Sequence, residues 1–243
     1  MIIPLGGIDP AWLLLMFVSI VLGGAAQFFI STTFKKWSRV RSANGLTGAQ
    51  VAETILSRNH ISARVAGAAE GVHAVRVVQS VGGNLSDHYD PRNGTVALSE
   101  QVYGESTIAA TAVAAHEVGH ALQTAEGYFP SRLRKAMVPV VNFGSNLAWL
   151  FIFIGLFMHV FQLFYLGIAF FALAVLFQIV TLPVELNASS RAMVQLREGG
   201  LLTTGELSGA RKVLTAAAFT YVAAALISVL QLLYFLGLGG RRD

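Results

Sequence analysis

The sequence contains no cysteine. Disulfides, iron–sulfur clusters and thiolate metal sites are therefore excluded, and any metal site must use histidine and carboxylate side chains. Charged residues are scarce as well, at 12% of the chain against roughly 25% in soluble globular proteins. Because 54% of the residues are hydrophobic, one soluble core of this size could not bury all the apolar surface. The composition predicts an integral membrane protein.

Four apolar segments are candidates to span a bilayer, since about 20 residues cross the ~30 Å of hydrocarbon. The first, residues 11–30, has no charged residue and is too long for the core of a signal peptide, so we expect a retained membrane helix. The others cover residues 138–160, 161–182 and 213–236, with a tight turn at 159–162. These segments predict a mainly α protein with about four transmembrane helices.

Basic residues outnumber acidic ones, 17 to 13, and most of them lie beside the apolar segments. No long basic stripe is present, so their distribution indicates a lipid bilayer as partner and no nucleic acid. The positive-inside rule places the polar regions after the first and third segments in the cytoplasm. The residues behind this orientation are Lys35, Lys36, Arg39, Arg41, Arg132, Arg134, Lys135, Arg191, Arg197, Arg211 and Lys212, whereas Arg241 and Arg242 contradict it.

The longest polar region, residues 31–135, has patterns typical of a small α+β structure. They predict a helix from Leu46 to Arg58 capped by Thr47, strands at 75–78 and 95–99, a turn at 91–94, and an Ala-rich helix over 105–124. The strands suggest an edge to which an extended peptide could add, in which case substitutions of Val96 and Leu98 would alter peptide cleavage.

The Ala-rich helix contains His116-Glu117-Val118-Gly119-His120, an H-E-x-x-H motif. Residues four apart lie on the same helix face, about 5–6 Å from each other, so both imidazoles can reach one zinc ion at ~2.0–2.1 Å. Glu117 lies beside that face, where its carboxylate can take a proton from an attacking water without binding the ion. The motif alone also occurs by chance, so its interpretation depends on the helix and on a third ligand.

A catalytic zinc site needs a third protein ligand and an open fourth position. Glu185 is the strongest candidate, because two predicted spans separate it from His120 and both residues therefore lie on the same side of the membrane. Pro183 predicts the start of a helix on which small residues share a face with Glu185. The alternatives are a carboxylate that only interacts with the helix dipole, or a ligand role for Glu126, Glu198 or Glu206. Glu126 would need a sharp turn of the chain to reach the metal, and Glu198 and Glu206 are expected in a solvated loop.

Arg191 and the segment Asp87–Pro91 each allow two interpretations. Arg191 is placed to hold Glu185 by a charge-assisted hydrogen bond, or to act only as a positive-inside anchor. In the segment Asp87–Pro91, either His88 or Tyr89 lines the cleft and stabilises an oxyanion, or the aspartates cap a turn. Turn capping is the commoner use of aspartate in such a segment, and we favour it.

Four blocks of sequence are distinctive in combination: residues 87–91 (DHYDP), 96–99 with 102–103 (VALS, VY), 114–123 (AAHEVGHALQ) and 183–192 (PVELNASSRA). With them the chain resembles the YugP-type neutral zinc metallopeptidases of bacterial membranes over nearly its whole length. It resembles HtpX-type and CAAX-type membrane proteases more distantly. The resemblance implies a gluzincin-like site with His116, His120 and Glu185 as metal ligands and Glu117 as base. Asn187 stands where some relatives have an acid.

The sequence thus predicts a multi-pass zinc metalloendopeptidase of the cell membrane, with one catalytic Zn²⁺ and protein or peptide substrates. The expected regions are a transmembrane helix (1–30), a cytoplasmic zincin-like catalytic region (31–136), a transmembrane hairpin (137–184), a cytoplasmic helix with the third ligand (185–212) and a last transmembrane helix (213–243). The alternatives are a site-two-type intramembrane protease and a non-catalytic metal-binding membrane scaffold. A homo-oligomer or a membrane partner is left open.

Overall fold

The computed structural model describes residues 9–61, 74–83 and 86–240, so Arg241 and Arg242 lie outside the described residues. The chain forms two compact units. The helical unit comprises Met1–Gln27, Leu133–Leu182 and Phe219–Asp243, and the mixed unit comprises Phe28–Arg132 and Pro183–Ala218.

Four long helices supply the helical unit. They are α1 (Pro10–Trp37), α5 (Phe129–Phe157), α6 (Phe161–Glu198) and α7 (Thr204–Gly240). Among the described residues, these four helices are long and apolar enough to cross a membrane, and they correspond to the four predicted segments. The turn predicted after α5 is also present, with His159 at a φ of 58°.

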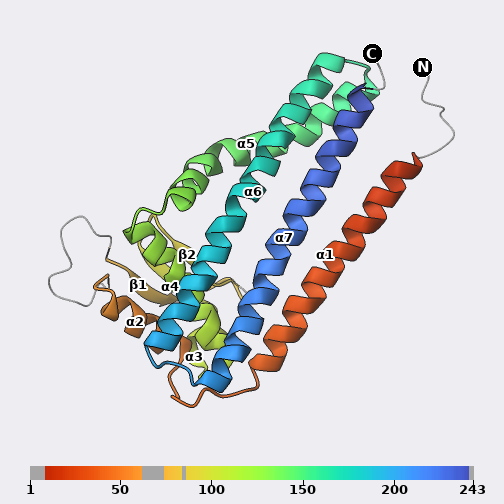
Figure 1. The fold of residues 1–243 in the computed structure, drawn as a ribbon. Coiled ribbons are helices and arrows are strands. Elements are labelled where there is room, and N and C mark those ends of the chain that lie inside the picture. Colours follow the sequence, from red (N-terminus) through yellow and green to blue (C-terminus); the bar gives the residue numbers. More distant parts are fainter. Residues whose placement is uncertain (1–8, 62–73, 84–85, 241–243) are drawn as a thin grey trace. The chain divides into compact units, whose positions relative to one another are not determined.

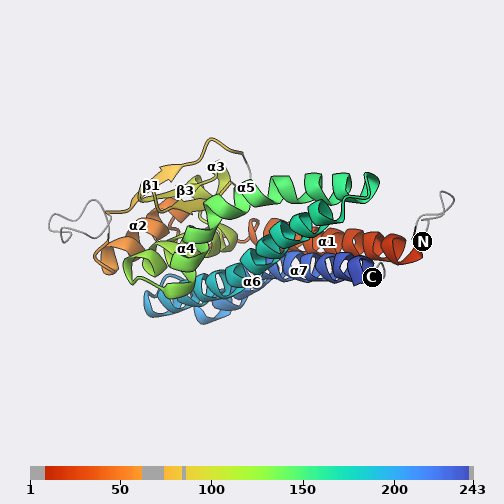
Figure 2. The same ribbon diagram turned by 90° about the horizontal axis from the view of Figure 1, so that it is seen from above.

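Aromatic side chains pack the helices of this unit together. Trp12 of α1 lies 5.2 Å from the ring of Tyr234 on α7, and the Tyr234 hydroxyl donates to Asp9 at 3.0 Å. Trp149 of α5 meets Phe235 of α7 edge to face at 5.8 Å. These contacts connect segments from both ends of the sequence, and α1 and α7 run side by side (Figures 1 and 2).

Helix α6 corrects one prediction from the sequence. Pro183 was expected to begin a new helix, but α6 continues through it to Glu198. A proline inside a helix removes one backbone hydrogen bond and costs about 3 kcal/mol. Burial offsets this cost here, because Val184 and Ala188, which follow the proline, are fully buried. Glu185 therefore lies in the interior of a long helix and not at a helix end.

Helix α7 begins earlier than its apolar segment. Thr203 and Glu206 form reciprocal hydrogen bonds at its first turn, and this capping box fixes the start of the helix. The Glu206 carboxylate also accepts from the backbone N–H of Ala43 at 2.7 Å. The expectation of a loop at Glu206 is therefore wrong, because the residue lies in the first turn of α7, where its largely solvated carboxylate joins the helix to the segment after α1.

The mixed unit contains a three-stranded sheet of β1 (Arg76–Gln79), β2 (His88–Asp90) and β3 (Thr95–Leu98). The strand order is β1-β3-β2, with β3 parallel to β1 and antiparallel to β2. Val96 and Leu98 are fully buried in the central strand. The proposed edge at 95–99 is therefore absent, and substitutions of Val96 or Leu98 would disturb the core rather than a peptide-binding edge.

Three shorter helices complete the mixed unit: α2 (Gly48–Arg58), α3 (Glu100–Gly104) and α4 (Ile108–Ala125). The predicted cap of α2 is confirmed, since the Thr47 side chain accepts from the backbone N–H of Gln50 and the Gln50 side chain accepts from that of Thr47. Thr107 caps α4 through the N–H of Ala110. Apolar residues of α2, β3 and α4 form the core, together with buried residues of α6 and α7.

Helix α4 lies against the last part of α6, and their backbones come unusually close. A Cβ added at Gly119 would lie 2.5 Å from the backbone oxygen of Ala188, a distance that real Cβ atoms do not show. Only glycine fits at position 119 without moving one of the two helices. As the sequence predicts from its small residues, this face of α6 packs close to α4, with Ala188 and Ala192 fully buried.

Candidate metal centre

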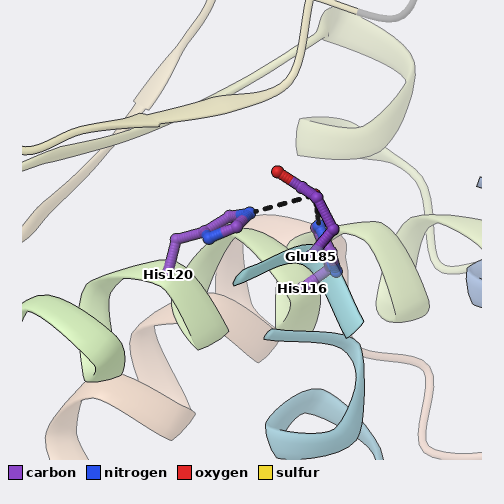
Figure 3. Close-up of side chains that lie close together, drawn as sticks. All are labelled: His116, His120 and Glu185. Atoms are coloured by element: carbon purple, nitrogen blue, oxygen red, sulfur yellow. Dashed lines mark ion pairs between the residues drawn. The ribbon is translucent and has the colours of Figure 1, made fainter. Parts of the chain in front are cut away.

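Three side chains from two distant parts of the sequence meet in the mixed unit (Figure 3). The Nε2 atoms of His116 and His120, on α4, lie 3.3 and 3.5 Å from Oε2 of Glu185 on α6. The two imidazole rings are 4.8 Å apart and nearly perpendicular. Among the described residues, these three form a group whose potential ligand atoms all lie within 4.8 Å of one another.

The distances within this group fit a tetrahedral metal ion. Atoms bound at ~2.0–2.1 Å to a tetrahedral zinc ion lie about 3.3–3.4 Å apart. The two nitrogen–oxygen distances, 3.3 and 3.5 Å, agree with this separation. Two imidazoles and one carboxylate are also a donor set of catalytic zinc sites, which leave the fourth position open. The residues present can therefore hold a zinc ion.

Negative charge surrounds His120. Burial of the imidazole lowers its pKa, but hydrogen bonding to Glu185 and the charges of Glu117 and Glu185 raise it by more. The pKa of His120 consequently lies above its usual value. The same negative environment favours a cation between these side chains.

Glu117 occupies the position next to His116 on α4 and is 8% exposed. Its side chain is not part of the three-residue group, although its charge acts on His120. A buried carboxylate near the group, but outside it, can accept a proton without competing for the ion. The role of Glu117 as a base stays a prediction from the H-E-x-x-H spacing.

The three rival carboxylates lie outside the group formed by His116, His120 and Glu185. Glu126 accepts from the guanidinium of Arg191 at 2.6 Å, and Glu206 caps α7. Glu198 lies at the end of α6 with 66% of its side chain exposed. The sequence offered Glu185 as a partner of Arg191, whereas the guanidinium donates in the structure to Glu126 and to Asn187, two positions after Glu185 on α6.

The segment Asp87–Pro91 shows two different uses of aspartate. The Asp90 carboxylate accepts from the backbone N–H of Arg92 and from the side chain of Asn93, so it caps the turn as predicted. The Asp87 carboxylate instead accepts from the backbone and hydroxyl of Ser99. Burial raises the pKa of Asp87, and the hydrogen bonds from Ser99 oppose this shift. A role for His88 or Tyr89 toward an oxyanion stays a prediction.

Two residues beside the histidines were missed in the sequence. The side-chain oxygen of Gln123 lies 3.1 Å from Nδ1 of His120, and the hydroxyl of Ser189 lies 3.1 Å from Nδ1 of His116. Spacing offered a signal for the first, because residues three apart share a helix face. No sequence pattern links Ser189 to His116, since the contact depends on how α4 and α6 pack.

Comparison with known proteins identifies the family. Residues 12–239 match the model of the family described as "Putative neutral zinc metallopeptidase". The chain belongs to this family of neutral zinc metallopeptidases. It is 46% identical over 210 residues to a Bacillus subtilis (strain 168) protein described as "Putative membrane protease YugP", and the match covers 86% of this chain and 88% of that relative. No solved structure shows a significant match.

These findings confirm the resemblance seen in the four sequence blocks. The relative is named as a membrane protease, and the described part of this chain has four helices that are long and apolar enough to span a bilayer. Both observations agree with the predicted membrane protein. The family description also agrees with zinc as the ion that suits two imidazoles and a carboxylate.

Proposed function

We propose that this protein is a membrane-bound zinc metalloendopeptidase that hydrolyses peptide bonds in proteins. One observation supports the proposal above all others: His116, His120 and Glu185 converge with nitrogen–oxygen distances of 3.3 and 3.5 Å. The three side chains come from helices that are far apart in sequence, so chance spacing of a short motif does not explain their meeting.

Each residue has a role in this proposal. The imidazoles of His116 and His120 and the carboxylate of Glu185 hold one zinc ion. When bound, zinc supplies Lewis acidity, which polarises a peptide carbonyl and lowers the pKa of a water molecule toward ~7. Glu117 takes the proton of the attacking water and returns it to the leaving amine. Its side chain is buried, which keeps most of the solvent away from the carboxylate.

The two alternatives fit the structure less well. In a site-two-type intramembrane protease the motif helix lies within the membrane, but α4 is not among the candidate spans of the described residues. A structural zinc site in a scaffold has four protein ligands. The group found in the described part of the chain has three potential ligands, which favours catalysis.

Hydrolysis that depends on zinc is the direct test. We expect the purified full-length protein in detergent to cleave an unfolded protein substrate, to lose this activity with a chelator, and to regain it when zinc is added back. Cleavage products can be identified by mass spectrometry. Activity that survives complete removal of the metal would contradict the proposal.

We also propose that the mixed unit faces the cytoplasm, on the basis of the positive-inside rule. The absence of cysteine permits a clean labelling test with single-cysteine variants. Ser57→Cys, exposed on α2, should react with a membrane-impermeant maleimide only after the cells are permeabilised. Met158→Cys, 69% exposed in the turn between α5 and α6, should react in intact cells. Labelling of Ser57→Cys in intact cells, and of Met158→Cys only after permeabilisation, would show that the mixed unit faces the outside.

A further inference from the structure

We infer that Gln123 sets the tautomer of His120 for metal binding, and that Asn187 and Arg191 hold Gln123 in the one orientation that can do so. The inference rests on the proposed function in one respect, which is that His120 is a zinc ligand. It concerns residues that act through His120, so they are positioning residues and not catalytic ones.

Both the oxygen and the nitrogen of the Gln123 side-chain amide have hydrogen-bond partners. The residue is fully buried and lies three positions after His120 on α4. Its oxygen Oε1 is 3.1 Å from Nδ1 of His120. Its nitrogen Nε2 donates to the backbone oxygen of Val184 at 2.8 Å and to Oδ1 of Asn187 at 3.0 Å.

The orientation of this amide follows from two groups, of which one can only donate hydrogen bonds and the other can only accept them. The guanidinium of Arg191 can only donate, and its Nε donates to Asn187 at 2.7 Å, so the oxygen of Asn187 must face it. The backbone oxygen of Val184 can only accept. The oxygen of Asn187 and the backbone oxygen of Val184 both lie next to the same end of the Gln123 amide. Because both are acceptors, this end must be the amide nitrogen. The oxygen of Gln123 is left facing His120.

This orientation determines which nitrogen of His120 carries the proton when the imidazole is neutral. An amide oxygen only accepts, so Nδ1 must donate to it. The lone pair is then on Nε2, which is the atom that lies 3.5 Å from Oε2 of Glu185. A metal ligand must offer a lone pair, and the partner of the other ring nitrogen commonly fixes the tautomer.

Arg191 also makes an ion pair with Glu126 and a cation–π contact with Tyr128. Its NH1 nitrogen lies 2.6 Å from the carboxylate of Glu126, and its guanidinium carbon lies 5.9 Å from the ring centre of Tyr128. The series of contacts thus runs from Arg191 through Asn187 and Gln123 to His120. His116 has no equivalent constraint, because its partner Ser189 carries a hydroxyl that can donate or accept.

The test compares the zinc affinity of full-length variants in detergent by competition with a chelator. Gln123→Met keeps the length of the side chain but removes both hydrogen-bonding atoms, and we expect a loss of about 10–100-fold in affinity. The matched control is Gln195→Met on α6, which removes an amide that contacts Asn59 away from the metal centre. This control should bind zinc as the wild type does.

A pair of substitutions at the half-buried Asn187 avoids the risk that a change at a fully buried residue prevents folding. Asn187→Leu removes one of the two acceptors that orient Gln123 and leaves the backbone oxygen of Val184, so zinc affinity should fall, but by less than in Gln123→Met. In Asn187→Asp a carboxylate oxygen can still accept from both Arg191 and Gln123, so zinc affinity should be preserved. Equal affinities in the two variants would overturn the inference.

Cobalt provides a readout that a purely structural role would not change. In the Co²⁺-loaded protein, the Nδ1–H protons of both histidines should give strongly shifted NMR signals that disappear in heavy water. We expect the signal of His120 to be lost or to exchange faster in Gln123→Met and to persist in Gln195→Met. Unchanged signals and unchanged zinc affinity in Gln123→Met would overturn the inference.

The outcomes separate this inference from the proposed function. A wild-type protein that binds zinc but cleaves no peptide would contradict the peptidase, while the expected affinity changes would still support the role of Gln123. A wild type that cleaves peptides, with Gln123→Met equal to it in zinc affinity, would remove the inference alone. A wild type that binds no divalent ion would overturn both.

Discussion

The Glu117→Gln protein is expected to bind zinc like the wild type and to lose nearly all peptide hydrolysis. Glutamine has almost the size and shape of glutamate, so the buried position on α4 can accept it. An amide cannot take a proton from water at neutral pH, and the loss of a general base typically slows a reaction by about 10²–10⁴-fold. The three potential metal ligands are unchanged by this substitution.

Two measurements check this prediction: the zinc content of the purified protein, and kcat/KM for a peptide substrate. Glu105→Gln is a matched control, because it makes the same chemical change at an exposed residue just before α4. The control should keep both zinc and activity. Hydrolysis at the wild-type rate in Glu117→Gln would show that another group accepts the proton.

The Glu185→Ala protein is expected to lose zinc and, with it, activity. The carboxylate is one of three potential ligands, and its oxygen lies within 3.5 Å of a nitrogen of each histidine. Losing a hydrogen-bond partner of a ligand already weakens metal binding by about 10–100-fold, and losing the ligand itself should cost more. The substitution also removes the negative charge that favours a cation between the imidazoles.

Metal analysis and chelator competition measure this effect directly. Glu198→Ala is the control, because Glu198 lies on the same helix but is exposed and outside the group. It was also considered as a ligand from the sequence, so retention of zinc in Glu198→Ala would exclude it. Glu185→Gln tests whether a side chain of the same shape but without charge can still bind zinc. Wild-type zinc affinity in both Glu185 variants would exclude Glu185 as a ligand.

Local patterns in the sequence predicted the elements that carry these residues. The H-E-x-x-H motif lies on a helix, Ile108–Ala125, close to the expected 105–124. The strand expected at 95–99 is β3, and the cap expected at Thr47 is present with its partner Gln50. Side-chain periodicity and capping act within a few residues, so a sequence alone can reveal them.

Predictions that needed knowledge of packing were less successful. Pro183 carries a strong local signal for a helix start, but burial of the residues that follow it outweighs this signal. The sequence offered Glu185 as a partner of Arg191, and only the packing of the helices determines that the guanidinium binds Glu126. Short elements such as β2 and α3 were not predicted, because three to five residues give too few positions for a period to show.

The capping box of α7 was overlooked, although the sequence contains its signature. Thr203-Thr204-Gly205-Glu206 has the spacing of a capping box, with a hydroxyl residue three positions before an acid. The apolar segment that follows suggested a start near residue 213, because hydropathy reports the membrane part of a helix and not its full length. The helix in fact begins at Thr204.

The close approach of α4 and α6 at Gly119 and Ala188 depends on the missing side chain at position 119. Any larger residue there would act as a spacer, because its Cβ would meet the backbone oxygen of Ala188. In the proposed metal centre, such a spacer would separate the helix that carries both histidines from the helix that carries Glu185.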